Sequence, residues 1–575
     1  MTTQPIISFK NFSFKYDAQA EPTLTDINLD IYPGEKVLIL GPSGSGKSTL
    51  GHCINGLIPH ALKGKITGEL FVNGKLTHKE SIFALSKSVG TVLQDTDHQF
   101  VGLTVKEDIA FALENSCMPV EQMEEQVNKW AKAVKIEDLL DHSPHDLSGG
   151  QKQRVSMAGV LVDETPILLF DEPLANLDPA SGQEATQLIK QLQEQTQATV
   201  VIIEHRLEDV LLAQVDRIVV FSQGRIVADT TPDQLLQSQT LASLGIREPL
   251  WVTAMRYAQV DLTQVSNIAN LAQLEAPELA TKLSQWQATQ PPVAQLAQTS
   301  PLLELKQVAF AYQEDAPKVV KNLNLTIGQG EMIALVGKNG AGKSTLAKLI
   351  CGFEKVSSGQ ILWHGAEQTQ DMGAWSIKEI ADHVGYVMQN PNQMITQVKI
   401  FDEVALGLRF RGVDEAVVVE KVEQVLRTCG LYPMRNWPVA ALSYGQKKRL
   451  TIASILVLDP QVIILDEPTA GQDYRHYTEM MEFLKEINQK GVTIIMVTHD
   501  MHLMLEYTQR AIVMVNGQVV ADSTPVKVLT NSGLVKQAAL KETSLFVLAN
   551  KVGLANPVTF TEKFIAYDRR VKHEC

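Results

Sequence analysis

The chain has 575 residues, of which 20% are charged and 45% hydrophobic, with a formal net charge of −14. This composition is typical of a globular protein with several domains, and the acidic balance argues against a protein that coats nucleic acid. No apolar run approaches the length of a membrane span, the N-terminus lacks a secretory signal pattern, and the five cysteines form no C-x-x-C pair. We therefore expect no membrane span and a reducing compartment.

The first predicted element is a short apolar strand at residues 37–40, which leads into the glycine-rich sequence GPSGSGKST. In such a loop the backbone N–H groups and the following helix N-terminus face the phosphates of a nucleotide. Its lysine would contact the β- and γ-phosphates, and its serine would bind Mg²⁺. The candidate residues of this loop are Gly41, Pro42, Ser43, Gly44, Ser45, Gly46, Lys47, Ser48 and Thr49.

Further candidates lie on either side of this loop. Tyr16 precedes Lys47 by 31 residues and is a candidate for stacking on an adenine ring. The turn LSGGQKQR at 147–154 enters a helix and predicts a second anion site, because helix N-termini attract anions. Its candidate residues are Ser148, Gly150 and Gln151.

The next apolar run, ILLFDEP at 167–173, places two acids at the end of a buried strand. Asp171 would hold Mg²⁺, and Glu172 would polarise the attacking water as a general base. His205 ends another β-rich run, 33 residues after Glu172, where it could reach the γ-phosphate side of the pocket.

The same motifs then occur a second time in the same order. Lys343 follows Lys47 at an offset of 296, Glu467 follows Glu172 at 295, and His499 follows His205 at 294. An offset shared this closely indicates two homologous modules. The remaining candidates of the second module are Tyr312, Gly337, Lys338, Asn339, Gly340, Ala341, Gly342, Ser344, Thr345, Gln389, Ser443, Gly445, Gln446 and Asp466, and Gln94 is the counterpart of Gln389.

The repeat sets the expected domain organisation. We expect modules at 5–245 and 302–530, a segment at 246–301 whose Gln/Ala/Pro-rich end is typical of a linker, and a tail at 531–575 that is either solvated or a small regulatory cap. Continuously apolar strands separated by helical stretches favour a buried, largely parallel sheet. The expected fold class is α/β.

With these motifs in this order, the sequence resembles the ATP-binding-cassette (ABC) family. The resemblance implies two tandem P-loop NTPase domains in a head-to-tail sandwich, with ATP and Mg²⁺ as cofactors and ATP hydrolysis as the activity. One site would join the loop at 41–48 to Ser443 and Gly445, and the other would join the loop at 337–344 to Ser148 and Gly150. It also implies Mg²⁺ binding by Ser48, Gln94, Asp171, Ser344, Gln389 and Asp466, and catalysis by Glu172, His205, Glu467 and His499.

Two positions depart from the family pattern. The family's signature sequence is LSGGQKQR at 147–154 in the first module and LSYGQKKR at 442–449 in the second, so Tyr444 stands where the first signature has Gly149. Gln472 stands where Leu177 lies in the first module. Neither departure removes a catalytic acid, a Mg²⁺ ligand or one of the two histidines, His205 and His499, which the family calls switch histidines. We therefore expect both sites to hydrolyse ATP.

Gln94 and Gln389 are the glutamines of the family's Q-loops. The segments after them are polar and contain the acid pairs Glu107-Asp108 and Asp402-Glu403 at the same offset of 295. They resemble the insertions of energy-coupling-factor (ECF) importers. This resemblance implies a peripheral protein on the cytoplasmic face of the membrane, partnered by an integral scaffold and a substrate-binding membrane subunit.

Two other classes are alternatives. A ribosome-associated twin cassette typically has a long, charge-rich helical hairpin as its linker, whereas residues 246–301 are net acidic and Gln-rich, which suits rRNA phosphate poorly. A DNA-repair cassette would need a long insertion, but both intervals from the glutamine to the signature serine are 54 residues.

Overall fold

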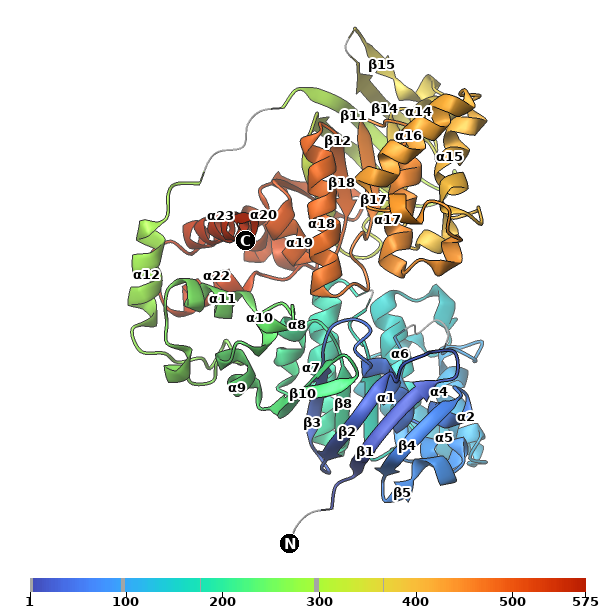
Figure 1. Ribbon diagram of the computed structural model, residues 1–575, viewed down its shortest axis with the longest axis vertical. Coiled ribbons are helices and arrows are strands. Elements are labelled where there is room, and N and C mark those ends of the chain that lie inside the picture. The colour runs from blue at the N-terminus through green and yellow to red at the C-terminus, as the bar shows by residue number, and fades with distance from the viewer. Residues whose placement is uncertain (1–3, 95–98, 176, 294–298, 366, 575) are drawn as a thin grey trace. The chain divides into compact units, whose positions relative to one another are not determined.

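The computed structural model describes residues 4–94, 99–175, 177–293, 299–365 and 367–574 (Figure 1). The chain divides into two compact units. Unit 1 contains residues up to 286 together with the short segments 473–475 and 551–553, and unit 2 contains the rest. Each unit holds one complete copy of the repeated motifs.

The central sheet of unit 1 has the strand order β10-β9-β3-β8-β7-β6, and all neighbouring pairs except β10–β9 are parallel. Its central strands are buried, and one face of the sheet packs in a single core with the strands of a second, antiparallel sheet. The strands are β3 (Lys36–Leu40), β6 (Val89–Val92), β7 (Ile167–Asp171), β8 (Thr199–Ile203), β9 (Arg217–Ser222) and β10 (Arg225–Thr230). The expected parallel α/β sheet is therefore confirmed.

Unit 2 repeats this sheet with the order β16-β17-β18-β13-β19-β20, and its antiparallel pair is β19–β20. Its strands are β13 (Met332–Val336), β16 (Val384–Val387), β17 (Val462–Asp466), β18 (Thr493–Val497), β19 (Arg510–Val515) and β20 (Gln518–Ser523). In both sheets the glycine-rich loop, the acid pair and the histidine follow the carboxyl ends of neighbouring strands. Ligands of open α/β sheets bind at this edge.

Each unit also has an antiparallel sheet that the sequence analysis did not predict. In unit 1 its order is β2-β1-β4-β5, and in unit 2 it is β12-β11-β14-β15 (Figure 1). These strands are β1 (Ile7–Tyr16), β2 (Leu24–Ile31), β4 (Gly64–Val72), β5 (Lys75–Leu76), β11 (Pro301–Phe310), β12 (Val320–Gly328), β14 (Ser358–His364) and β15 (Thr369–Asp371). Phe9, Phe12 and Phe14 of β1 pack with the central strands in one core.

Helices complete each unit, and corresponding helices match in the two copies. The helices after the P-loops are α1 (Lys47–Ile54) and α13 (Lys343–Ile350), and the signature helices are α6 (Gly149–Leu161) and α17 (Tyr444–Leu456). The helices that pack against the signature helices are α4 (Val105–Glu114), α5 (Val120–Ala133), α15 (Ile400–Phe410) and α16 (Glu415–Thr428). The helices after the acid pairs and the histidines are α7 (Pro179–Thr196), α18 (Tyr474–Gln489), α8 (Leu207–Val210) and α19 (Met501–Tyr507).

Most of the segment expected to be a linker is folded. It contains α11 (Leu250–Tyr257) and α12 (Leu279–Thr289), and the indole Nε1 of Trp251 donates to the carbonyl oxygen of Ile268 at 2.9 Å in a buried environment. The apolar face of α11 drives this packing, because buried large side chains stabilise a fold strongly. Residues 290–293 have no regular structure, and part of the Gln/Ala/Pro-rich end lies outside the described residues.

The C-terminal segment is also folded, in contrast to a solvated tail. It contains α22 (Ser544–Lys551) and α23 (Pro557–Glu574), and α23 contacts α19 and α20 (Pro525–Leu529). Phe560 and Phe564 of α23 are fully buried. This helix is therefore part of the core of unit 2.

Candidate functional site

The P-loop lysines bind the carbonyl groups of their own loops. Lys47 Nζ donates to the carbonyl oxygens of Gly41 at 2.7 Å and Pro42 at 2.9 Å. Lys343 Nζ makes the same bonds to Gly337 at 2.7 Å and Lys338 at 3.0 Å. Both ammonium groups thus lie inside the loop, where a phosphate held by the backbone N–H groups would meet them.

The first glycine of each loop is required by close packing. A Cβ atom at Gly41 would lie 2.3 Å from the carbonyl oxygen of Phe221, and one at Gly337 would lie 2.1 Å from that of Met514. Side-chain carbons do not approach a backbone oxygen this closely. The rest of the candidate loop residues, 42–46 and 338–342, connect β3 to α1 and β13 to α13.

The structure brings the expected Mg²⁺ ligands together in pairs. Ser48 Oγ donates to Asp171 Oδ1 at 3.4 Å, and Ser344 Oγ donates to Asp466 Oδ2 at 3.5 Å. A hydroxyl and a carboxylate at this spacing fit the oxygen ligands that Mg²⁺ prefers. Burial, with the charge of Glu172, raises the pKa of Asp171 to about 6, which fits a carboxylate that a cation stabilises in its charged form.

The expected catalytic glutamates have the same backbone conformation. Glu172 has φ of 47° and Glu467 has φ of 46°, both in the left-handed region that non-glycine residues rarely adopt. The N–H of Glu172 donates to Ile203 and that of Glu467 to Val497, both at 2.9 Å. Strained residues held this firmly cluster at functional sites.

The surroundings of the two glutamates differ. Gln94 Nε2 donates to Glu172 Oε2 at 2.7 Å, so Gln94 contacts the expected general base rather than Asp171. Burial would raise the pKa of Glu172, but the adjacent His205 imidazole and nearby cations lower it overall. Burial, with the charge of Asp466, raises the pKa of Glu467 to about 8.

Each switch histidine lies beside the glutamate of its own unit. His205 Nδ1 lies 3.8 Å from Glu172 Oε1, and His499 Nε2 lies 3.8 Å from Glu467 Oε1. The sequence analysis placed these histidines on the γ-phosphate side of the pocket, and their contact with the glutamates was not predicted. The ring nitrogen that faces the glutamate, however, is not the same.

The two candidate adenine-stacking tyrosines are tied to the P-loop helices. The Tyr16 hydroxyl lies 3.2 Å from Thr49 Oγ1, and the Tyr312 hydroxyl lies 3.1 Å from Thr345 Oγ1. These contacts place both tyrosines next to the loops that would hold the phosphates.

The signature serines and glutamines cap their own helices. The N–H of Ser148 donates to Gln151 Oε1 at 2.9 Å, and the N–H of Ser443 donates to Gln446 Oε1 at 2.9 Å. This is the reciprocal half of a capping box, which fixes the first turn of a helix. Gly150 and Gly445 lie in that first turn.

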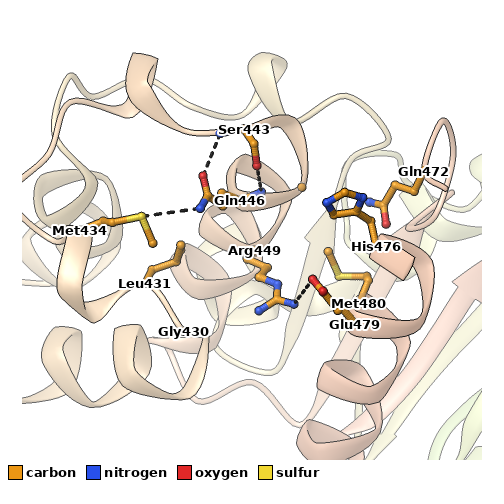
Figure 2. Close-up of a pocket in the computed structure, with 11 residues that line it drawn as sticks. Gly430, Leu431, Met434, Ser443, Gln446, Arg449, Gln472, His476, Glu479 and Met480 are labelled. Atoms are coloured by element: carbon orange, nitrogen blue, oxygen red, sulfur yellow. Dashed lines mark hydrogen bonds and ion pairs between the residues drawn. The ribbon is translucent and has the colours of Figure 1, made fainter. Parts of the chain in front are cut away.

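In unit 2 the signature lines a cavity of about 180 Å³, shown in Figure 2. Ser443, Gln446 and Arg449 of the signature helix face it, and Arg449 pairs with Glu479 of α18 at 3.6 Å. The remaining lining residues are Gly430, Leu431, Met434, Gly445, Gln472, His476 and Met480.

The acid pairs after the Q-loops brace the segments that precede them. Asp108 Oδ1 accepts from the N–H groups of Val101 at 2.8 Å and Gly102 at 3.0 Å. Glu403 Oε2 accepts from those of Thr396 at 2.9 Å and Gln397 at 2.7 Å. Residues 95–98 of the first segment lie outside the described residues.

These braced segments present an apolar side chain at matching positions. Leu103 is 83% exposed and Val398 is 77% exposed. Their offset is 295, the same as that of the two Q-loop glutamines. The exposed aliphatic side chain is therefore a feature that the two copies of the repeat share.

The sequence analysis missed three residues at these sites. Lys448 Nζ donates to the carbonyl oxygens of Glu467 at 2.7 Å and Pro468 at 2.9 Å. The Tyr386 hydroxyl donates to Asp466 Oδ2 at 3.0 Å. Buried Glu204 lies against His205. Lys448 lies in the second signature, where the first has Gln153, so the repeat could have singled it out as a difference between the two copies. Glu204 could have been found by comparing it with Thr498 at the offset of the two histidines.

In the described parts of the chain, no helix combines the length and the hydropathy that a membrane span needs. No group of three or more metal-ligating side chains occurs among the described residues. Mg²⁺ bound with a nucleotide needs fewer protein ligands than that, because phosphate oxygens and water complete its coordination.

Known proteins resemble this chain over its whole length. A family model described as ABC transporter matches residues 24–175 and 320–470, and one described as ATP-binding cassette cobalt transporter matches 238–310. A putative ABC transporter ATP-binding protein of Enterococcus faecalis is 60% identical over 99% of both chains, and one of Clostridium perfringens is 54% identical over 100% of both. The structure of cbiO1 from Clostridium perfringens, titled as part of the ABC transporter complex cbiONQ, is 32% identical with a TM-score of 0.38, covering 41% of this chain and 94% of that chain.

Proposed function

Because this chain belongs to the family of ABC transporter ATP-binding proteins, which are ATPases, we propose that it powers solute import as the ATP-hydrolysing subunit of an ECF-type membrane transporter. The match of residues 238–310 to a model described as ATP-binding cassette cobalt transporter supports a role in transport. The transported solute is then selected by a separate membrane subunit.

In this proposal the chain's own residues perform hydrolysis in each unit. Lys47 and Lys343 bind the β- and γ-phosphates, while Ser48 with Asp171 and Ser344 with Asp466 hold Mg²⁺, which neutralises phosphate charge. Glu172 and Glu467 orient the attacking water and accept its proton, a role worth about 10²–10⁴ in rate. His205 and His499, each beside the glutamate of its unit, contact the γ-phosphate.

We further propose that the two cassettes pair within the chain. Each signature helix has the positive end of its dipole at the signature serine, which suits a phosphate that its own P-loop does not hold. ATP bound by both cassettes favours the paired state over the open one, and hydrolysis removes that preference.

The observation that carries the transport assignment is the pair of exposed aliphatic side chains, Leu103 and Val398, each held beside a Q-loop by a buried or part-buried acid. An apolar contact surface on the segment that follows each Q-loop glutamine can pass motion from the ATP site to a partner, because Gln94 itself contacts Glu172. Two such surfaces, one in each unit, suit a membrane scaffold that offers two coupling elements.

The test is purification of the tagged full chain from detergent-solubilised membranes. We expect recovery of an integral scaffold together with a small membrane protein, and loss of both with Leu103→Glu/Val398→Glu. The matched control is Val227→Glu/Val520→Glu, which places the same charges on the exposed faces of β10 and β20. Recovery of ribosomes without membrane proteins contradicts the proposal. Recovery of the membrane proteins in equal amounts by the Leu103→Glu/Val398→Glu variant and by its control also contradicts it.

A further inference from the structure

The residue before each switch histidine occupies the same backbone position in the two units. Glu204 follows β8 and Thr498 follows β18. The N–H of Glu204 donates to Ile39 at 3.2 Å, and that of Thr498 donates to Leu335 at 3.3 Å. Glu204 is 1% exposed and Thr498 is fully buried, so a carboxylate in one unit replaces a hydroxyl in the other.

The two side chains make different contacts from this shared position. Glu204 Oε1 accepts from the backbone N–H of His205 at 3.0 Å and lies 3.2 Å from the Nδ1 atom of the same histidine. Thr498 Oγ1 instead donates to Glu467 Oε2 at 3.4 Å and accepts from the N–H of Asp500 at 3.0 Å. The residue therefore contacts the histidine in unit 1 and the catalytic glutamate in unit 2.

This difference accompanies the opposite presentation of the two imidazole rings. In unit 1 the Nδ1 atom of His205 faces the acids, whereas in unit 2 the Nε2 atom of His499 faces Glu467. A carboxylate that accepts from one ring nitrogen fixes the tautomer and the direction of the other. In unit 1 the nitrogen left for a ligand is Nε2.

We propose that Glu204 is a positioning residue of the first ATP site, which holds His205 through Nδ1–H so that Nε2–H donates to the γ-phosphate. This inference rests on the proposed function, because it takes ATP as the ligand of the P-loop at 41–48. It also makes the two ATP sites of the chain chemically unequal.

The charges around His205 support this role. Three charged groups act on the His205 imidazole: the carboxylates of Glu172, which follows β7, and Glu204, and the guanidinium of Arg206. Burial alone would lower the pKa of His205, but the contacts with Glu172 and Glu204 raise it overall, with Arg206 opposing. The imidazolium that can donate to a phosphate is thus maintained to higher pH.

The test measures binding of ATPγS and ADP to the full chain from pH 6 to pH 9. Lys343→Ala removes phosphate binding by the second P-loop, so the ratio of the two affinities reports the γ-phosphate contact of the first site. With Glu204→Gln or Glu204→Thr we expect the decline of this ratio with rising pH to begin about one pH unit lower, which makes the ratio about tenfold smaller above that point. ADP affinity should stay unchanged, which also shows that the variant is folded.

The reciprocal variant uses the second site. In a Lys47→Ala background, Thr498→Glu should extend the preference for ATPγS to higher pH.

The matched control for the Glu204 variants of the first site is Asp209→Asn. It removes a charge from the same segment, but from a carboxylate that lies 3.9 Å from Arg206. This control should leave the pH profile of the first site in place.

Two results overturn the inference. An unchanged pH profile in both Glu204 variants shows that the carboxylate does not act through His205. An equal loss of ATPγS and ADP affinity at every pH shows a purely structural role. Failure of the unsubstituted chain to bind either nucleotide instead contradicts the proposed function itself.

Discussion

The hydroxyl of Tyr444 donates to the carbonyl oxygen of Gln389 at 3.3 Å, so the residue that departs from the glycine-rich signature links the signature helix of unit 2 to its Q-loop. The first signature has Gly149 at this position and no side chain to make such a link. Tyr444 therefore adds a contact within unit 2 without removing the serine or the second glycine of the signature.

Removing this hydroxyl should loosen the second Q-loop. A hydrogen bond of this kind contributes about 1 kcal/mol, which corresponds to roughly fivefold faster local opening. We expect Tyr444→Phe to raise hydrogen–deuterium exchange in residues 389–394 by about that factor. The control is Tyr432→Phe, which removes a hydroxyl bonded to Glu423 at 3.3 Å in the same unit. Equal exchange in both variants would show that the link has no energetic role.

Both glutamates that we propose as general bases should be required for full turnover. Glu172 and Glu467 share one strained backbone conformation, and each lies beside a switch histidine. We expect Glu172→Gln and Glu467→Gln each to lower ATP turnover, and the double variant to lower it by about 10²–10⁴. Steady-state phosphate release measures this effect. A single variant with the full rate of the parent would show that its site does not contribute.

The first P-loop glycine should tolerate no side chain. In Gly41→Ala the new Cβ meets the carbonyl oxygen of Phe221 at 2.3 Å, so the backbone of β9 or of the loop must move. We expect a loss of about 1–3 kcal/mol in the free energy of unfolding and weaker nucleotide binding. The control is Gly44→Ala, because a Cβ there meets nothing within 4 Å although its φ of 73° is also left-handed. A larger loss in the control would assign the effect to backbone strain instead.

The sequence predicted the strands that consist of an unbroken run of apolar residues. The buried strands of the central sheets are uninterrupted apolar runs, and the repeat identified the residues at their carboxyl ends. The antiparallel sheets were missed because β1 mixes buried Phe12 and Phe14 with exposed residues and has a bulge between Lys10 and Ser13. Glu204 was missed because its importance comes from a contact with a neighbouring ring, which no spacing rule encodes.

The C-terminal helix should contribute to the stability of unit 2. Phe564 is fully buried, and its truncation removes apolar contacts and leaves a cavity in a packed core. We expect Phe564→Ala to lower the free energy of unfolding by about 3–5 kcal/mol. Phe410→Ala in the same unit is the control, because Phe410 is 79% exposed and should change stability by less than about 0.5 kcal/mol. Chemical denaturation of both variants decides whether the tail belongs to the folded core.

A buried lysine should make the stability of unit 2 depend on pH. Lys448 is 2% exposed, and burial lowers its pKa to about 8 despite the nearby Glu467 and Asp466. The unfolded chain therefore binds this proton more tightly than the folded one between about pH 8 and the ordinary lysine pKa. The free energy of unfolding should rise with pH across that window, and the charged lysine should be most costly below it.

The variant Lys448→Gln isolates this effect, because glutamine occupies the matching position of the first signature helix as Gln153. Gln153 Nε2 also donates to a carbonyl, that of Pro173, so the substitution keeps a donor at this place. We expect the difference in thermal midpoint between the parent and the variant to shift in favour of the parent from pH 7.5 to pH 9.5. Both proteins carry Glu467→Gln, so that the titration of Glu467, which is coupled to the charge of Lys448, is absent and the remaining titrating groups cancel in the difference. A pH-independent difference would mean that Lys448 stays charged in the folded state through its bonds to Glu467 and Pro468.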